Sequence, residues 1–216
     1  MYFTLDYAEH ATLDDGTRVS LRLLRATDRE MVQRGFERLS AHSRYSRFLA
    51  PKSTLTESEL RYLTEIDQES HVAIGAIRDA DGEGLGLARF IRMSDDATRA
   101  EVAITVADEA QGKGLGRLLF VRLAAAAAER GIATLRLEVL GSNEQIKQLV
   151  RAVSPEHTSE IANGVASIEL PVPAVSPTEL PTETSIAMNP LYRAFRLAAE
   201  QALAWTAIAR RFVSLK

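Results

Sequence analysis

The chain has 216 residues, of which 46% are hydrophobic and 25% are charged, so it is long and apolar enough to bury one globular core. Its net charge of −3 argues against nucleic-acid binding by bulk electrostatics, and its lack of cysteine excludes disulfides, thiolate metal sites and a cysteine nucleophile. No charged N-terminal region precedes an apolar run, and no stretch approaches about 18 uninterrupted apolar residues, so we expect a cytoplasmic protein without a membrane span.

The N-terminal part of the chain is predicted to contain one strand and two helices. Residues 1–16 mix aromatic and acidic side chains and are interpreted as an N-terminal extension. The alternating pattern of residues 17–25 predicts the first strand of the domain. Two capping boxes, Thr27-x-x-Glu30 and Thr56-x-x-Glu59, each predict the start of a helix. The basic and aromatic segment 43–48 between them predicts a loop.

The middle and the later part of the chain are predicted to alternate between strands and helices. Alternating apolar residues predict strands, and an apolar run after a glycine turn predicts a long helix. The pattern Ser142-x-x-Gln145 predicts the cap of a shorter helix. The dipeptide Asn163-Gly164 predicts a hairpin turn. The expected elements are the strands 71–78, 85–93, 101–106 and 133–140, the helix from about 116 to 128, a short helix after 142, and a final hairpin reaching 172.

Glycines at two other places have local explanations. Gly35 lies inside the first helix, where it costs about 1 kcal/mol relative to alanine, so we expect a close packing contact there. Residues 82–86, Gly-Glu-Gly-Leu-Gly, lead into an alternating strand and therefore predict a hairpin turn without an anion site.

The glycine-rich turn of residues 111–116, between a strand and a helix, predicts an anion site. Glycines allow successive backbone N–H groups to point into one concavity, and the helix that follows adds its unpaired N–H groups and its dipole. The nucleoside-triphosphate P-loop pattern fails because Gly114, and no serine or threonine, follows Lys113. The dinucleotide fingerprint fails because its glycine spacing is one residue longer.

The turn resembles the acyl-CoA-binding signature of the GNAT acetyltransferase superfamily, Gln/Arg-x-x-Gly-x-Gly/Ala, at Gln111, Gly114 and Gly116, with Asp108 on the approach. The order of predicted elements also resembles that of the GNAT fold. The resemblance implies an α/β (α+β) domain over residues 17–172, whose mixed and mostly antiparallel sheet splays between its fourth and fifth strands. It further implies that acetyl-CoA binds as co-substrate, with its pyrophosphate on Gln111, Gly112, Lys113, Gly114, Leu115 and Gly116.

The resemblance also implies roles for residues outside the turn. The edge of the fourth strand, at Ile104 and Val106, is expected to pair with the pantetheine amides, and Asn143 matches a position that contacts the pantetheine arm. Asn143 is equally well explained as a residue at a helix N-terminus. Glu101 is similar in context to a general base in bacterial protein-lysine acetyltransferases, and the loop around Arg44 and Tyr45 also resembles theirs. The alternative for Glu101 is a solvated acid that pairs with Arg99 or Arg89.

One departure from the family pattern concerns the general acid. Many GNAT enzymes have a tyrosine near the fourth helix that protonates the thiolate, but no tyrosine lies between Gly141 and Met188. Two roles are open for Tyr45, Tyr62 and Tyr192. Each is either a substitute for the missing general acid or a residue that serves packing alone. The histidines lack ligand spacing, so no metal is expected.

The composition changes after the predicted domain. From Ser154 to Met188 there is no lysine or arginine. An acidic, extended linker over 173–189 is predicted by Pro171, Pro173, Pro177 and Pro181. Residues 190–216 predict an amphipathic helix with an apolar stripe. A homodimer contact, a strap across the domain and a helix on a membrane surface are all compatible with that stripe.

These observations predict an N-acyltransferase that moves an acetyl group from acetyl-CoA to an amine, either a protein lysine or a small molecule. The transfer is expected to be direct, with help from a general base. The alternative is a non-catalytic acyl-CoA-binding regulatory module, since fold alone does not determine function.

Overall fold

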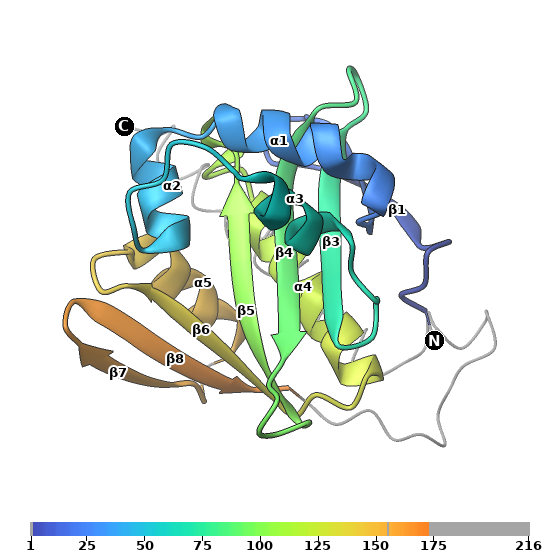
Figure 1. Cartoon of the computed structure of the whole chain (residues 1–216). Helices are drawn as coiled ribbons and strands as arrows, with labels where there is room; N and C mark the ends of the chain where they lie inside the picture. Colours follow the sequence, from blue (N-terminus) through green and yellow to red (C-terminus); the bar gives the residue numbers. More distant parts are fainter. Residues whose placement is uncertain (1, 155, 173–216) are drawn as a thin grey trace, which may run out of the picture. The chain divides into compact units, whose positions relative to one another are not determined.

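A computed structural model describes residues 2–154 and 156–172, which form one sheet with helices on both faces (Figure 1). The strand order is β1-β2-β3-β4-β5-β6-β8-β7. The strands are β1 (Ala8–Thr12), β2 (Arg18–Leu23), β3 (His71–Arg78), β4 (Gly84–Arg92), β5 (Arg99–Val106), β6 (Thr134–Leu140), β7 (Thr158–Ala162) and β8 (Val165–Pro171). The helices are η1 (Ala26–Asp28), α1 (Arg29–Glu37), α2 (Ala41–Phe48), α3 (Glu57–Thr64), η2 (Asp108–Ala110), α4 (Leu115–Glu129) and α5 (Glu144–Val153).

The sheet splits at the junction between β5 and β6. These two strands pair in parallel from Arg99 and Thr134 as far as Val102 and Leu137. From Ala103 onward β5 pairs with β4 alone, while β6 continues its antiparallel pairing with β8. The predicted mixed sheet, mostly antiparallel and splayed between the strands 101–106 and 133–140, is therefore confirmed.

The two faces of the sheet differ in what covers them. Helix α4 packs on one face, where its leucines lie against β3, β4 and β5. At Gly86 a Cβ atom would lie 2.8 Å from a methyl group of Leu119, so the close approach of α4 requires glycine there. Helices α1, α2 and α3 cover the other face, which we call the front face (Figure 1). Phe36, Leu39, Leu55 and Leu60 form a separate apolar cluster beneath them.

Several predicted elements are confirmed by the structure. The strands 71–78 and 85–93 form the hairpin β3–β4, and Thr56 and Glu59 form the predicted capping box of α3. Asn163 and Gly164 both have positive φ, at 51° and 80°, as a two-residue hairpin turn requires. The predicted linker 173–189 and helix 190–216 lie outside the described residues.

The prediction of a loop at 43–48 is wrong, because this segment belongs to α2. Ser40 caps the helix by accepting a hydrogen bond from the Ser43 N–H, and Leu49 ends it in the left-handed conformation. The interpretation of 1–16 as an extension also misses a strand, because Ala8–Thr12 pairs with β2 along its whole length.

Two predicted caps are displaced, by two residues at the first helix and by one residue at α5. At the first helix the capping carboxylate belongs to Asp28, which accepts from the Arg25 N–H at 2.7 Å and pairs with Arg22. At α5 the cap is Asn143 in place of Ser142, with its Oδ1 accepting from the Ile146 N–H at 3.2 Å. Neighbouring polar residues have similar capping propensity, so tertiary partners decide between them.

The close contact expected at Gly35 is also absent. No atom lies within 4 Å of the position that a Cβ would take there. Among residues 2–154 and 156–172, no helix is long and apolar enough to cross a membrane.

Candidate active site

The turn between η2 and α4 presents backbone amides at a helix N-terminus. Gly112 and Gly114 have φ values of +70° and +84°, which L-residues other than glycine rarely adopt. Gly114 is the N-cap of α4 and makes no side-chain capping bond. The first amides of α4, beginning at Leu115, have no acceptor within the helix. An anion that binds in this concavity meets both these amides and the positive end of the helix dipole.

Side chains around the turn hold its shape. The amide of Gln111 donates to the Ser43 Oγ and to the Val106 carbonyl, each at 3.2 Å. The Lys113 ammonium pairs with Asp15 at 2.8 Å, and the Asp14 N–H donates to the Lys113 carbonyl. The side chains of Gln111 and Lys113 therefore brace the turn against α2 and the β1–β2 hairpin, and the anion site is formed by the main chain.

Asp108 connects the same turn to the front face. Its carboxylate accepts from the Ser40 N–H at 2.9 Å, from the Ser40 hydroxyl at 2.9 Å and from the Ser43 hydroxyl at 2.7 Å. Partial burial opposes ionisation of this carboxyl, but the hydrogen bonds from Ser40 and Ser43 outweigh it and hold the pKa of Asp108 below its ordinary value. The N-terminus of α2 is thereby fixed to the approach of the anion site.

The part of β5 beyond the split, residues 103–106, lies along the gap in the sheet and leads to η2 and the glycine turn. Ile104 and Val106 lie in this part, and both are partly buried. Asn143 lies across the gap, where the chain leaves β6 and enters α5, and its Oδ1 is occupied in capping that helix. An extended molecule that starts at the glycine turn can follow the free edge of β5 between these two elements.

Glu101 lies on the front face of β5, just before the split. It is exposed, and its neighbours in register are Ile91 on β4 and Arg136 on β6. Neither of its two expected partners pairs with it. Arg99 pairs with Glu169 on β8, and Arg89 donates to the Tyr62 carbonyl at 3.4 Å and to the His71 ring.

Two arginines beside Glu101 are electrostatically unusual. Arg89 is only 3% exposed, and its Nε atom has no hydrogen-bond partner within the described part of the chain. Burial, together with the nearby charge of Arg47, lowers the pKa of Arg89 to about 10. Burial also lowers the pKa of Arg47 on α2, against the opposing charge of Glu101. The front face thus holds one buried cation, Arg89, one partly buried cation, Arg47, and one carboxylate close together.

His71 and Tyr62 complete this cluster. The Arg89 guanidinium lies 5.3 Å from the centre of the Tyr62 ring, which favours a cation–π contact. Burial and the charge of Arg89 lower the pKa of His71 to about 4, so its ring is neutral near pH 7 and accepts from Arg89.

The sequence did not point to Arg47, Arg89 or His71 as a group. One local pattern indicated Arg89. The alternation of β4 places this charged residue at a strand position that faces into the fold. Arg47 lies in the segment 39–48 that resembles a loop of bacterial protein-lysine acetyltransferases, but no role was predicted for it.

The structure also bears on the candidate tyrosine acids and on metal binding. Tyr45 and Tyr62 are 43% and 57% exposed, so neither is enclosed near the free edge of β5, and Tyr192 lies outside the described residues. Within 2–154 and 156–172, no three histidine, aspartate or glutamate side chains gather in a way that could hold a metal ion.

Comparison with known proteins agrees with this geometry. The model of the acetyltransferase (GNAT) domain matches residues 18–153. Acetyltransferase PA5475 of Pseudomonas aeruginosa is 33% identical over 87 residues, which are 39% of this chain and 47% of that protein. The matched part thus spans about half the length of this relative.

Solved structures show the same fold. The GNAT domain of S. lividans PAT is 28% identical, with a TM-score of 0.70 over 76% of this chain and 96% of that domain. The acetyltransferase yncA from Salmonella typhimurium, solved with acetyl-CoA, is 16% identical, with a TM-score of 0.59 over 76% of this chain and 99% of that one. Because the family model covers more than half of its length, the chain belongs to the GNAT acetyltransferase family.

Proposed function

We propose that this protein transfers an acetyl group from acetyl-CoA to an amine. The observation that carries the proposal is the joining of two features, an amide-lined turn at the N-terminus of α4 and a strand, β5, whose edge becomes free at Ala103 beside it. Membership of the GNAT family supports it, as does the acetyl-CoA in the related yncA structure.

In this proposal the main chain binds the cofactor. The diphosphate binds the amides of Gln111 to Gly116, and the pantetheine arm pairs with β5 at Ile104 and Val106. The Asn143 side-chain amide, whose Oδ1 caps α5, offers its Nδ2 group to the same arm. The thioester then lies near the split of the sheet, on the side of Glu101.

Glu101 is proposed as the general base. The acceptor ammonium loses one proton to this carboxylate, and its nitrogen attacks the thioester carbonyl carbon. A C–N bond forms, the C–S bond breaks, and the sulfur leaves with the bonding electron pair as the CoA thiolate. The second proton of the nitrogen is released as the intermediate collapses, so that the products are the amide, CoA thiol and one proton for each ammonium consumed.

A charge placed in the first turn of α4 tests the cofactor site. A Cβ on Gly116 would meet only a Val106 methyl group at 3.7 Å, so Gly116→Asp fits the fold, and a carboxylate at a helix N-terminus favours the helix. The same carboxylate repels a diphosphate, so we expect Gly116→Asp to weaken acetyl-CoA binding about 10- to 100-fold relative to Gly116→Asn.

The measurement is titration calorimetry with acetyl-CoA and with CoA, together with a thermal melt of each variant. If the aspartate and asparagine variants bound acetyl-CoA with equal affinity, the diphosphate would not bind at this turn. If the unaltered protein bound neither acetyl-CoA nor CoA, the proposed acetyl transfer would be refuted. The alternative, a non-catalytic acyl-CoA sensor, would be refuted as well. A sensor would bind acetyl-CoA without releasing thiol in the presence of any amine.

A further inference from the structure

An apolar cavity of about 100 Å³ lies between the front face of the sheet and helices α1, α2 and α3. Phe36 on α1 and Leu87 on β4 contribute to its walls, and Thr105 on β5 brings it to the part of that strand that is free of β6. Arg47 also lines it. The cavity therefore extends from the proposed path of the cofactor toward the middle of the sheet.

Two glycines keep this cavity open. Gly35 belongs to the stripe of α1 that faces the sheet, three residues after Val32, and Gly75 lies opposite Leu87 in the central strand β3. No atom lies within 4 Å of the position that a Cβ would take at either residue. Glycine weakens both helix and strand interiors, and here no close contact requires it. The two positions lower stability and leave space, which indicates that the space has an occupant.

Arg47, which lines the cavity, favours an occupant with a negative charge. In the part of the chain that the structure describes, Arg47 is partly buried and forms no ion pair, and the buried cation Arg89 lies close to it. Two like charges that are largely shielded from water cost free energy unless an anion joins them. The nearest carboxylate that acts on Arg47 is Glu101, which carries the opposite charge on the exposed side of the cluster.

These groups form a three-part site. Glu101 and Arg47 present a negative and a positive charge side by side, and the apolar cavity begins at Arg47. A free α-amino acid has the matching arrangement, because an ammonium, a carboxylate and a side chain all leave one carbon atom. We propose that the acceptor is a free α-amino acid with an apolar side chain, whose carboxylate binds Arg47, whose side chain fills the cavity and whose nitrogen meets Glu101.

This inference rests on the proposed acetyl transfer and narrows it. A lysine side chain in a protein has no carboxylate beside its amine, and Arg89 is too deeply buried to meet the surface of a protein partner. The transfer itself is unchanged: one C–N bond forms, one C–S bond breaks, and the product is an N-acetyl amino acid and CoA thiol.

The first test compares matched amines with the unaltered protein. Thiol release from acetyl-CoA is followed with L-leucine, L-leucinamide, L-alanine and a lysine-containing peptide whose termini are blocked. Leucinamide lacks only the negative charge, so we expect leucine to have a kcat/KM at least about 30-fold higher, as for the loss of a charged hydrogen bond. Alanine should fall below leucine because it leaves the cavity empty. Equal values for leucine and leucinamide, or a preference for the peptide, would overturn the inference.

The second test uses variants. Arg47→Gln should remove the preference for leucine over leucinamide and leave the affinity for acetyl-CoA unchanged, whereas Arg61→Gln on the exposed side of α3 should change neither. Gly75→Val fills the cavity, so it should raise the melting temperature and lower activity with leucine more than with alanine. If Arg47→Gln lowers activity with both amines equally, or Gly75→Val leaves the leucine-to-alanine ratio intact, the proposed acceptor is wrong.

A binding measurement covers the case in which no amine is turned over. Leucine and leucinamide are titrated into the protein saturated with CoA, and only leucine should produce heat and raise the melting temperature. If leucine and leucinamide give the same heat and the same melting temperature, the proposal of an amino-acid acceptor is contradicted. Because acetyl-CoA affinity is measured separately, failure of this inference is distinguished from failure of the proposed function.

Discussion

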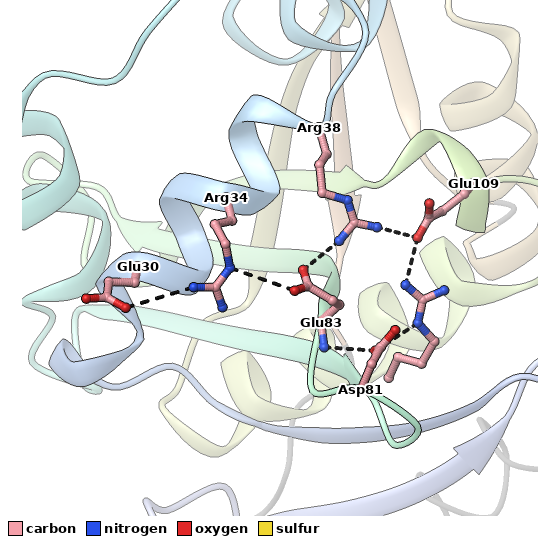
Figure 2. Close-up of polar contacts among 7 residues, drawn as sticks. Glu30, Arg34, Arg38, Asp81, Glu83 and Glu109 are labelled. Carbon is pink, nitrogen blue, oxygen red and sulfur yellow. Dashed lines mark hydrogen bonds and ion pairs between the residues drawn. The ribbon is translucent and has the colours of Figure 1, made fainter.

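Arginines in two regions of this protein differ in what balances their charge. On the outer side of α1, Arg34 and Arg38 reach Glu83, and Arg38 and Arg78 share Glu109, so each guanidinium has a carboxylate partner (Figure 2). We call these residues the outer network. Beneath α2 and α3, Arg47 and Arg89 lie close together, and neither forms an ion pair with a carboxylate in 2–154 or 156–172. We call these two the inner pair.

The difference indicates separate roles. The outer network joins α1 to the β3–β4 turn and to η2, which precedes the glycine turn, and its partly exposed ion pairs contribute little each. The inner pair has cation–π and hydrogen-bonding contacts but lacks the anion that would compensate its burial. Charges that serve the fold are expected to be paired within the fold. Charges left unpaired in the interior are expected to meet a ligand.

The largest expected effect concerns the carboxylate beside the inner pair. If Glu101 removes the proton from the acceptor, Glu101→Gln should lower kcat about 10²- to 10⁴-fold, because the amide cannot accept that proton. The affinity for acetyl-CoA should be unchanged. Steady-state rates of thiol release and calorimetry check both statements.

The matched control is Glu83→Gln in the outer network, which removes a carboxylate from two arginines without approaching β5. It should leave kcat within about twofold, as expected for a surface substitution away from the site. Similar losses in the two variants would mean that Glu101 acts through stability, and the role of base would be withdrawn.

The inner pair and the outer network should also respond with opposite signs when an arginine is replaced by methionine. Arg47→Met removes a partly buried cation that has no ion-pair partner among the described residues, so we expect the free energy of unfolding to rise by about 1 kcal/mol. Arg38→Met removes two ion pairs and should lower it by about 0.5 kcal/mol. Urea unfolding of both variants measures the two changes. Destabilisation by Arg47→Met greater than that by Arg38→Met would show that the inner pair already has a compensating partner.

The sequence predicted the scaffold better than the charges. Alternation and the glycine turns placed nearly every strand, because these are local signals that survive in any context. The resemblance of the element order to that of the GNAT fold then implied the split of the sheet, which the register of β5 and β6 confirms. The helix α2 was missed because its polar and basic residues resemble a loop until Ser40 is seen to cap it and Asp108 to fix that cap.

The candidate site was predictable only where it consists of backbone. The turn 111–116 was visible because glycines reveal main-chain geometry. The inner pair was not visible, because an arginine on a strand or a loop normally lies in water, and only tertiary packing places Arg89 under Tyr62. Gly35 was correctly marked as costly, but the sequence could not tell a close contact from an empty space.

A smaller effect is expected from pH at the edge of the inner pair. Burial, aided by the charge of Arg89, lowers the pKa of His71 from about 6.5 to about 4, so the unfolded chain binds more protons than the native one between these values. Stability therefore rises with pH through this window and is lost as the pH falls from about 6.5 toward 4. Because the ring is partly exposed, we expect roughly 1 kcal/mol, well below the full effect of such a shift.

The measurement is urea unfolding at pH 7 and pH 5 for the unaltered protein and for His71→Gln. The unaltered protein should lose roughly 1 kcal/mol more than the variant, which has no imidazole to protonate. If the free energy of unfolding changed with pH in the same way in the unaltered protein and in His71→Gln, burial and Arg89 would not lower the pKa of His71.

The smallest effect distinguishes the two groups of arginines by their response to salt. At about 0.01 M salt, Arg38→Met should lower the free energy of unfolding by about 0.5 kcal/mol, and at about 1 M this difference should approach zero, because partly exposed charges are screened. The change caused by Arg47→Met should depend less on salt, since the Arg47 guanidinium is partly buried. If salt erased both differences equally, water and ions would reach Arg47 freely. The inner pair would then need no ligand to compensate its charge.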